Sequence, residues 1–180
     1  MIKTPLLHIL DKYLIWNALY LKSRQEKKVA REYEKFGLDF YLPLAKRLSV
    51  WSDRKKWVED PLFRGYIFVP QRLKDADKFL YILGVVGYVN YNGKRAEIKQ
   101  VELKIIQEFI EKGYHVEAAS KEDLEKGDKV AIASGTLKGL EGTVIESQGE
   151  SYFMIAVEGI GQVIKVKVPK EVLIKMPDET

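Results

Sequence analysis

The sequence predicts an α+β fold in two parts, an antiparallel sheet flanked by helices followed by a small β-barrel. The hydrophobic pattern changes near residue 112, from mixed helix and strand periods to strand periods alone. Net charge changes there too: residues 1–112 hold 22 basic and 14 acidic residues (net +8), and residues 113–180 hold 8 and 12 (net −4). We therefore expect a first domain over 1–112, a linker over 113–125 and a second domain over 126–180.

The first domain opens with elements whose faces can be assigned. Residues 1–15 fit a short amphipathic helix that extends the domain at its N-terminus, and Trp16–Leu21 fits a strand. Residues 23–36 predict a helix, because at 100° per residue its basic and apolar side chains fall on opposite sides. The basic ones are Arg24, Lys27, Lys28, Arg31 and Lys35, and the apolar ones are Val29, Ala30, Tyr33 and Phe36. We expect the apolar side to pack on a sheet and the basic side to face water or a polyanion.

Alternating strands and helices complete this domain. Residues 38–51 and 62–69 predict strands on either side of a charged hairpin. A short helix over 75–83 would place Ala76, Phe79, Leu80 and Leu83 on one face, and residues 85–91 predict a further strand. The last helix, over 99–112, would bury Val101, Ile105, Ile106, Phe109 and Ile110. This order of elements favours a small antiparallel sheet covered by helices.

Short strands make up the second domain. Five are expected, over 127–134, 141–148, 151–158, 162–168 and 171–175. The loop between the first two carries glycines at 135, 139 and 142. Glycine lets a strand turn sharply or approach a neighbour closely, because it has no Cβ. The pattern is typical of a binding module.

Composition excludes several classes of function. The chain has no cysteine and only two histidines, His8 and His115, so a disulfide framework, a thiolate metal site and a histidine cluster are excluded. No apolar run approaches the roughly 20 residues of a membrane span, and residues 1–15 do not fit a signal peptide. No catalytic triad, phosphate-cradling loop or metal-ligand spacing appears. We therefore expect a cytoplasmic protein that is not an enzyme and needs no cofactor.

Four segments carry a family resemblance. GDKVAIASGTLKGLEGTVIE (Gly127–Glu146) resembles the KOW motif of small SH3-like barrels. WNALYLKSRQEKKV, PLFRGYIFV and GVVGYVNYNGK precede it in the order found in the NusG family of transcription elongation factors. The run DRKKWVEDPLF is most similar to specialised paralogues of the RfaH and UpxY type. The resemblance implies a polymerase-binding NGN domain followed by a KOW domain.

This resemblance implies a transcription elongation or antitermination factor. In the family, the first domain docks on the clamp of bacterial RNA polymerase and suppresses pausing by keeping the clamp closed. The positions that match the family's apolar docking cavity are Tyr20, Phe63, Tyr66, Tyr91 and Leu103. The alternative is that these residues are ordinary core, since buried aromatic side chains contribute much apolar area.

The basic helix face is a second candidate site. By resemblance, non-template DNA in the elongation complex would contact Lys22, Arg24, Gln25, Lys28 and Arg31. Lysine and arginine supply salt-dependent affinity for phosphates, and arginine and glutamine also read base edges. The alternative is a solvated helix face partly neutralised by Glu32 and Glu34.

Apolar residues in the loops of the second domain are the third candidate site. Leu137, Leu140 and Ile160 match family positions that bind a small-subunit ribosomal protein or the termination factor Rho, or else they cap the barrel end. We expect a monomer with no membrane contact. Two other functions stay open: a ribosome-associated KOW protein that binds rRNA, and a general NusG-like factor that promotes Rho termination.

Overall fold

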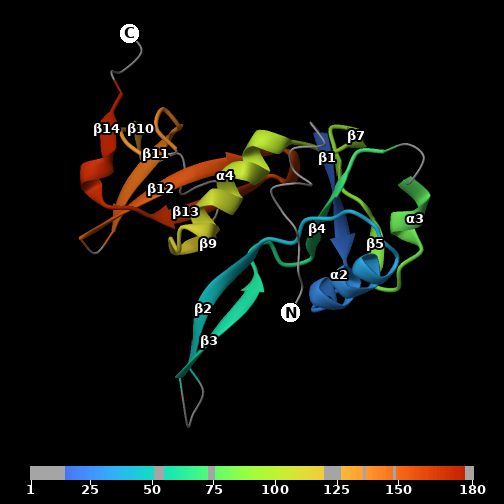
Figure 1. Ribbon diagram of the computed structural model, residues 1–180. Helices are drawn as coiled ribbons and strands as arrows, with labels where there is room; N and C mark the ends of the chain where they lie inside the picture. The colour runs from blue at the N-terminus through green and yellow to red at the C-terminus, as the bar shows by residue number, and fades with distance from the viewer. Residues whose placement is uncertain are drawn as a thin grey trace. The chain divides into compact units, whose positions relative to one another are not determined.

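The computed structural model describes residues 15–50, 55–72, 76–119, 127–135, 137–147 and 149–176. The chain divides into two compact units, Met1–Gln107 and Glu108–Thr180, and each is described by itself (Figure 1). The predicted helix over 1–15 lies outside the described residues, apart from its last position. No helix in the described part of the chain is long and apolar enough to cross a membrane.

The first unit is built on an antiparallel sheet. Strand β1 lies at its centre, between β4 and β5, and also pairs with β8. Strands β2 and β3 form a separate hairpin that extends away from this sheet in Figure 1. The elements are β1 (Ile15–Leu21), α2 (Glu26–Lys35), β2 (Leu44–Val50), β3 (Lys55–Pro61), β4 (Tyr66–Pro70), α3 (Ala76–Leu80), β5 (Val85–Tyr88), β6 (Asn90–Tyr91), β7 (Lys94–Arg95), β8 (Glu97–Lys99) and α4 (Gln100–Glu111), whose residues from Glu108 on belong to the second unit.

The two faces of the sheet follow from the alternation of side chains along a strand. On one face, Leu19 and Leu21 of β1 join a core with Val29, Ala30 and Tyr33 of α2. The Tyr33 hydroxyl donates a hydrogen bond to the Phe79 carbonyl, 2.9 Å away, and so ties α2 to α3. On the other face Trp16 and Ala18 are buried, whereas Tyr20 at the end of the same row is exposed. The basic helix therefore packs its apolar side on the sheet, as its sequence predicts.

Helix α2 begins later than predicted, at Glu26 rather than at residue 23. Arg24 has a φ of 59°, a left-handed conformation that is unfavourable for a residue with a Cβ and does not fit a right-handed helix. The helix also ends one residue early, so Phe36 becomes the C-cap and is 66% exposed instead of buried.

Three expected core positions, Leu80, Leu83 and Val101, are likewise exposed. Helix α3 ends at Leu80, so Leu83 lies beyond it and does not share its buried face. In α4 the fully buried positions include Leu103, Ile106 and Phe109, spaced by three residues, and Val101 lies on the opposite side. The predicted strand over 62–69 is shorter at its start, because residues 62–65 form the connection between β3 and β4.

The second unit holds a six-stranded antiparallel sheet in the order β14-β10-β11-β12-β13-β9. Its strands are β9 (Val116–Ala119), β10 (Asp128–Ile132), β11 (Glu141–Ser147), β12 (Glu150–Val157), β13 (Gln162–Lys167) and β14 (Leu173–Lys175), with short 3-10 turns at η2 (Glu158–Ile160) and η3 (Lys170–Val172). All five strands predicted for this part of the chain are present. Among the described residues the end strands β14 and β9 do not pair with each other, so no closed barrel is formed there.

Strand β9 lies inside the segment 113–125 that the sequence marks as a linker. It pairs with β13, with Val116 opposite Val166. Val116 is the single strongly apolar residue of β9, so this segment lacks the alternation of apolar and polar residues that would predict a strand. The strand forms because β13 offers an unpaired edge, and this determinant lies about 50 residues further along the chain in the sequence.

Gly142 in β11 is a glycine that close packing requires. A Cβ at this position would lie 2.6 Å from Phe153 Cζ and 2.7 Å from the Met154 carbonyl oxygen. Phe153 is fully buried, so its ring has no space into which to move. We expect Gly142→Ala to destabilise the second unit by about 1–3 kcal/mol, as overpacking of a core does.

Segment-resolved hydrogen exchange over β11–β13 would measure this loss. Gly139→Ala is the control, because nothing lies within 4 Å of a Cβ there and only its φ of +84° opposes a side chain. Unchanged protection in Gly142→Ala would contradict the steric explanation.

Candidate functional site

An exposed tyrosine and a half-buried one form an aromatic pair at the surface of the first unit. Tyr20 of β1 lies opposite Tyr66 of β4 in the strand register. Their ring centroids are 5.0 Å apart, and the Tyr66 hydroxyl lies 3.4 Å from that of Tyr20. Tyr20 is 43% exposed, at the end of a face that is otherwise buried. Burial and the hydrogen bond to Tyr20 raise the pKa of Tyr66 to about 12, so its hydroxyl stays protonated and uncharged at neutral pH.

The other predicted cavity residues do not share this exposure. Phe63 is only 2% exposed and packs edge-on against Phe68, with ring centroids 5.9 Å apart. Leu103 is fully buried in α4. Tyr91 is half exposed, on the short β6–β7 hairpin. The alternative that these residues are ordinary core thus describes Phe63 and Leu103, whereas Tyr20, Tyr66 and Tyr91 present area to solvent.

The five predicted nucleic-acid contacts fall on a turn and a helix rather than on one helix. Lys22, Arg24 and Gln25 precede α2, and Lys28 and Arg31 lie on it. All except the half-buried Gln25 are exposed. Lys27 and Lys35 of the same predicted stripe are engaged within the protein, Lys27 with the Glu59 carbonyl and Lys35 with the Glu32 carboxylate at 2.7 Å.

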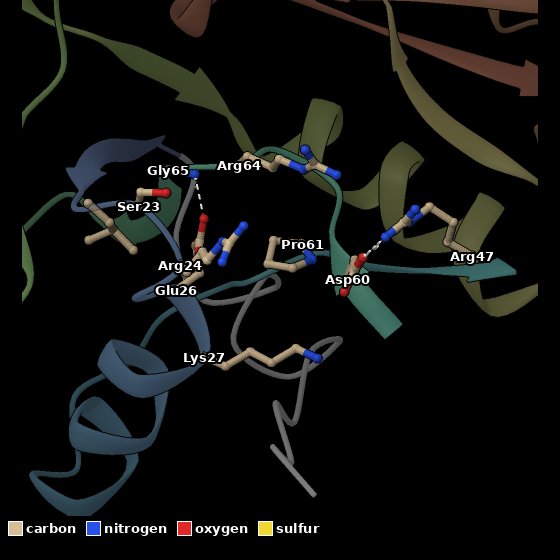
Figure 2. A pocket seen from close by; sticks show the side chains of 10 residues that line it. Ser23, Arg24, Glu26, Lys27, Arg47, Asp60, Pro61, Arg64 and Gly65 are labelled. Carbon is tan, nitrogen blue, oxygen red and sulfur yellow. Dashed lines mark hydrogen bonds and ion pairs between the residues drawn. The ribbon is translucent and has the colours of Figure 1, made fainter. Parts of the chain in front are cut away.

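A hollow of about 690 Å³ lies beside this turn, between the start of α2 and the region where β3 leads into β4. Figure 2 shows the side chains that surround it. The basic ones come from three separate segments: Arg24 and Lys27, Arg47, and Arg64. Glu26 and Asp60 are the acidic ones. The lining therefore carries an excess of positive charge.

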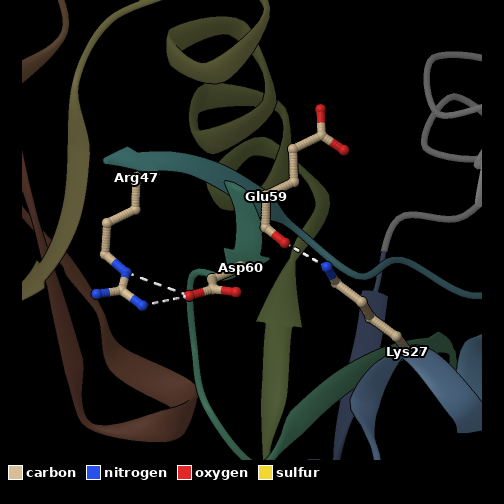
Figure 3. Close-up of polar contacts among 4 residues, drawn as sticks. All are labelled: Lys27, Arg47, Glu59 and Asp60. Atoms are coloured by element: carbon tan, nitrogen blue, oxygen red, sulfur yellow. Dashed lines mark hydrogen bonds and ion pairs between the residues drawn. The ribbon is translucent and has the colours of Figure 1, made fainter. Parts of the chain in front are cut away.

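Three contacts hold the walls of the hollow together. The buried Glu26 carboxylate accepts a hydrogen bond from the Gly65 backbone N–H at 2.7 Å. Asp60 accepts from Arg47 Nη2 at 2.8 Å and from Nε at 3.2 Å. The Lys27 ammonium donates to the Glu59 carbonyl (Figure 3). The turn, the hairpin and the β3–β4 connection are thereby fixed relative to one another.

Sequence reasoning missed two surfaces. It did not group Arg47 or Arg64 with Arg24, because those residues meet only in the folded chain. It also missed an apolar groove beside α3, where Tyr81 is 84% exposed. Its other lining residues are Lys28, Glu32, Phe36, Leu38, Lys78, Ile82 and Leu83. The available signal in the sequence was the apolar run at residues 81–83, directly after the residues that form α3.

In the second unit, the three predicted loop contacts differ in exposure. Leu137 and Leu140 are partly exposed on the loop between β10 and β11, and Ile160 is buried in the turn η2. Of the three predicted contacts, the two leucines are therefore the ones with area exposed to solvent. Among the described residues, no group of three or more His, Asp or Glu side chains is placed to hold a metal ion.

Comparison with known proteins agrees with this architecture. The family model described as transcription termination factor NusG matches residues 14–107, just over half of the chain. The solved structure titled "Domain interaction in Thermotoga maritima NusG" is 20% identical, with 90% of this chain and 97% of that chain covered and a TM-score of 0.55. A structure of the MjSpt4:Spt5 complex is 21% identical over 91% of this chain and 99% of that one, with a TM-score of only 0.29. No curated protein matches.

Proposed function

The chain belongs to the NusG family of transcription factors, and from this premise we propose that it binds bacterial RNA polymerase through its first unit and suppresses pausing or termination. The observation that supports this most is the Tyr20–Tyr66 pair at the end of a buried sheet face, in which Tyr20 is exposed and Tyr66 is half-buried. Exposed aromatic clusters of this kind are typical of protein interfaces. The family consists of transcription factors without enzymatic activity, in agreement with the absence of a catalytic motif from the sequence.

Within the first unit we assign the polymerase contact to Tyr20, Tyr66 and Tyr91. Phe63 and Leu103 are too buried to offer area to a partner, so their role is to support the surface from within. Docking of this surface on the clamp would keep the clamp closed and so oppose pausing. The run DRKKWVEDPLF supports a relation to specialised paralogues of the RfaH and UpxY type.

Exposed cations in the first unit, at the start of α2 and on it, favour contact with non-template DNA. Lys22, Arg24, Lys28 and Arg31 project from the turn and from α2. Exposed cations bind phosphates at low energetic cost, because they displace condensed counterions. Gln25 adds a side chain that can hydrogen-bond to a base edge.

For the second unit we propose a KOW-type barrel that recruits a second protein, a small-subunit ribosomal protein or Rho. The antiparallel sequence of its strands, and the close packing at Gly142 where β11 approaches β12, support a KOW-type fold. The partly exposed Leu137 and Leu140 support a protein contact. An rRNA-binding role is less favoured, since residues 113–180 carry a net charge of −4.

A second candidate function is the promotion of termination, because the matching family model is described by that activity. Both candidates share polymerase binding and differ in the outcome at a terminator. We therefore expect shortened pauses in either case, and the response to Rho decides between them.

The test is single-round transcription by purified bacterial RNA polymerase on a template with a pause site and a Rho-dependent terminator. Shortened pauses with read-through would support the antiterminator, and shortened pauses with increased Rho termination would support the general factor. A Tyr20→Ala/Tyr66→Ala variant should lose either effect. Pause lifetimes unchanged by the wild-type protein, on this template and on templates with varied non-template sequence, would contradict the proposal.

A further inference from the structure

Three large apolar side chains are exposed around the groove beside α3. Phe36 directly follows α2, and Tyr81 and Leu83 follow α3. All three line the groove, whose volume is about 680 Å³. Scattered exposed apolar residues are ordinary on a protein surface, but several of them around one concave site indicate that the site binds a partner.

The fold does not require these three side chains. At the end of α2, the Leu38 N–H donates to the Tyr33 carbonyl at 2.9 Å, and Leu38 packs on the core. After α3, Ile82 packs on the same core, and its carbonyl accepts the Val85 N–H at 3.1 Å. The core contacts of both segments are thus made by the residues that form the floor of the groove. The exposed side chains around that floor remain available to a partner.

The two walls of the groove are fixed relative to each other. Gly84 follows the groove segment, and its carbonyl accepts the Lys22 N–H at 2.8 Å. A Cβ at Gly84 would lie 3.1 Å from Val29 Cγ2 and 3.2 Å from Gln25 Cβ, so this segment lies close against α2. A groove with walls held in this way does not need to be ordered when a partner binds, which preserves binding energy.

The charges of the groove lining indicate the chemistry of the partner. Lys28 of α2 and Lys78 of α3 are exposed and line the groove. The lining also holds Glu32, whose carboxylate lies 2.7 Å from the ammonium of Lys35, and this contact offsets its charge. A positive lining favours a partner with acidic side chains. It opposes a two-fold contact between copies of this chain, which would bring the same lysines together.

The shape and the walls of the groove favour a helix as its occupant. None of the lining residues belongs to a strand, so a peptide cannot extend a sheet there. An amphipathic helix instead places its apolar side chains into an apolar groove. We propose that the groove binds an amphipathic helix of a second protein, with apolar residues at positions i, i+3 or i+4 and i+7 and acidic residues beside them.

Binding of this helix is compatible with polymerase docking. Helix α2 packs against the sheet face that carries Leu19 and Leu21, and Tyr20 lies on the opposite face. The first unit can therefore hold the helix of the partner while its tyrosines contact polymerase, and the chain then connects the two proteins. The helix site itself does not depend on polymerase, because one unit supplies all of its walls.

The test measures binding of two labelled helical peptides to the full-length protein by fluorescence anisotropy. Both peptides carry leucines at positions i, i+3 and i+7, and one has glutamates beside them where the other has lysines. We expect the glutamate peptide to bind roughly tenfold more tightly at low salt. Tyr81→Ala/Leu83→Ala should weaken its binding at least about tenfold, as the loss of interface anchors does. Ile174→Ala removes an exposed apolar residue of the second unit and should keep the wild-type affinity.

A charge-reversal variant separates a changed contact from a damaged fold. Lys28→Glu/Lys78→Glu makes the groove lining acidic, so this variant should bind the lysine peptide more tightly than the glutamate peptide. A damaged groove would instead weaken the binding of both peptides and would not invert the preference.

Four outcomes would overturn the proposal, and none of them bears on polymerase binding. The first is that the wild-type protein binds neither peptide, or binds the glutamate peptide no more tightly than Tyr81→Ala/Leu83→Ala does. The second is binding to vesicles of anionic lipid that this variant loses, which would make the groove a membrane contact. The third is self-association that the variant loses, which would make it a contact between copies. The fourth is peptide binding only after deletion of residues 2–13, which would make this chain's own N-terminal segment the occupant.

Discussion

Alanine at both Tyr20 and Tyr66 is expected to lower the affinity for RNA polymerase by about 100-fold. The two rings contact each other, with centroids 5.0 Å apart, and both project from the end of the sheet face. Removing an aromatic anchor from an interface typically costs about 2 kcal/mol or more. Residues in contact are not additive, so we expect a combined loss of about 3 kcal/mol, roughly two orders of magnitude in Kd. Titration of the protein onto immobilised polymerase would measure it.

Tyr81→Ala is the matched control for this variant. Tyr81 is even more exposed, at 84%, but it lies in the groove beside α3 rather than beside Tyr20. It should therefore leave the affinity for polymerase within about twofold, as expected for an exposed residue outside the interface. Wild-type affinity in a folded Tyr20→Ala/Tyr66→Ala variant would show that polymerase binds elsewhere.

Much of the fold was predictable because local patterns and tertiary packing agree. The apolar side of α2 contains Val29, Ala30 and Tyr33, all buried as the helical period predicts. The errors in the helices occur at their ends. Phe36 and Leu83 are apolar residues that continue a helical pattern past the point where the helix stops. Periodicity cannot place that point, since it depends on backbone conformations such as the left-handed one at Gly37, directly after the end of α2.

The candidate site was predictable only in part, for a different reason. The alternation along β1 groups Trp16, Ala18 and Tyr20 on one face from sequence alone. Which of them stays uncovered depends on what lies over that face, and Trp16 and Ala18 are buried whereas Tyr20 is not. Arg64 joins Arg24 only through the contact of Gly65 with Glu26, 39 residues apart, so no local pattern signals the hollow.

The residues of one sequence motif have two different roles: Phe63 supports the docking surface from inside, and Tyr66 forms part of that surface. PLFRGYIFV contributes Phe63, Tyr66 and Phe68, and of these three aromatic residues only Tyr66 is partly exposed. Phe63 packs edge-on against Phe68, which in turn contacts Tyr41 with centroids 6.2 Å apart. Phe68 lies opposite Ala18 in the register, two residues from the Tyr20–Tyr66 pair. Phe63 therefore stabilises the sheet face that presents the tyrosines.

Phe63→Ala should consequently act on stability first, lowering the free energy of unfolding of the first unit by about 3–5 kcal/mol. Urea unfolding followed by tryptophan fluorescence would measure the loss, because all three tryptophans lie in the first unit and Trp16 is fully buried on the same sheet face. Tyr91→Ala is the control, because Tyr91 is 51% exposed and its truncation should cost less than about 1 kcal/mol. A Phe63→Ala variant with wild-type stability and weakened polymerase binding would instead make Phe63 a direct contact. We thus expect the substitution at Phe63 to reduce stability and the substitutions at Tyr20 and Tyr66 to reduce affinity. These results would distinguish a residue that supports the docking surface from inside from the residues that contact polymerase.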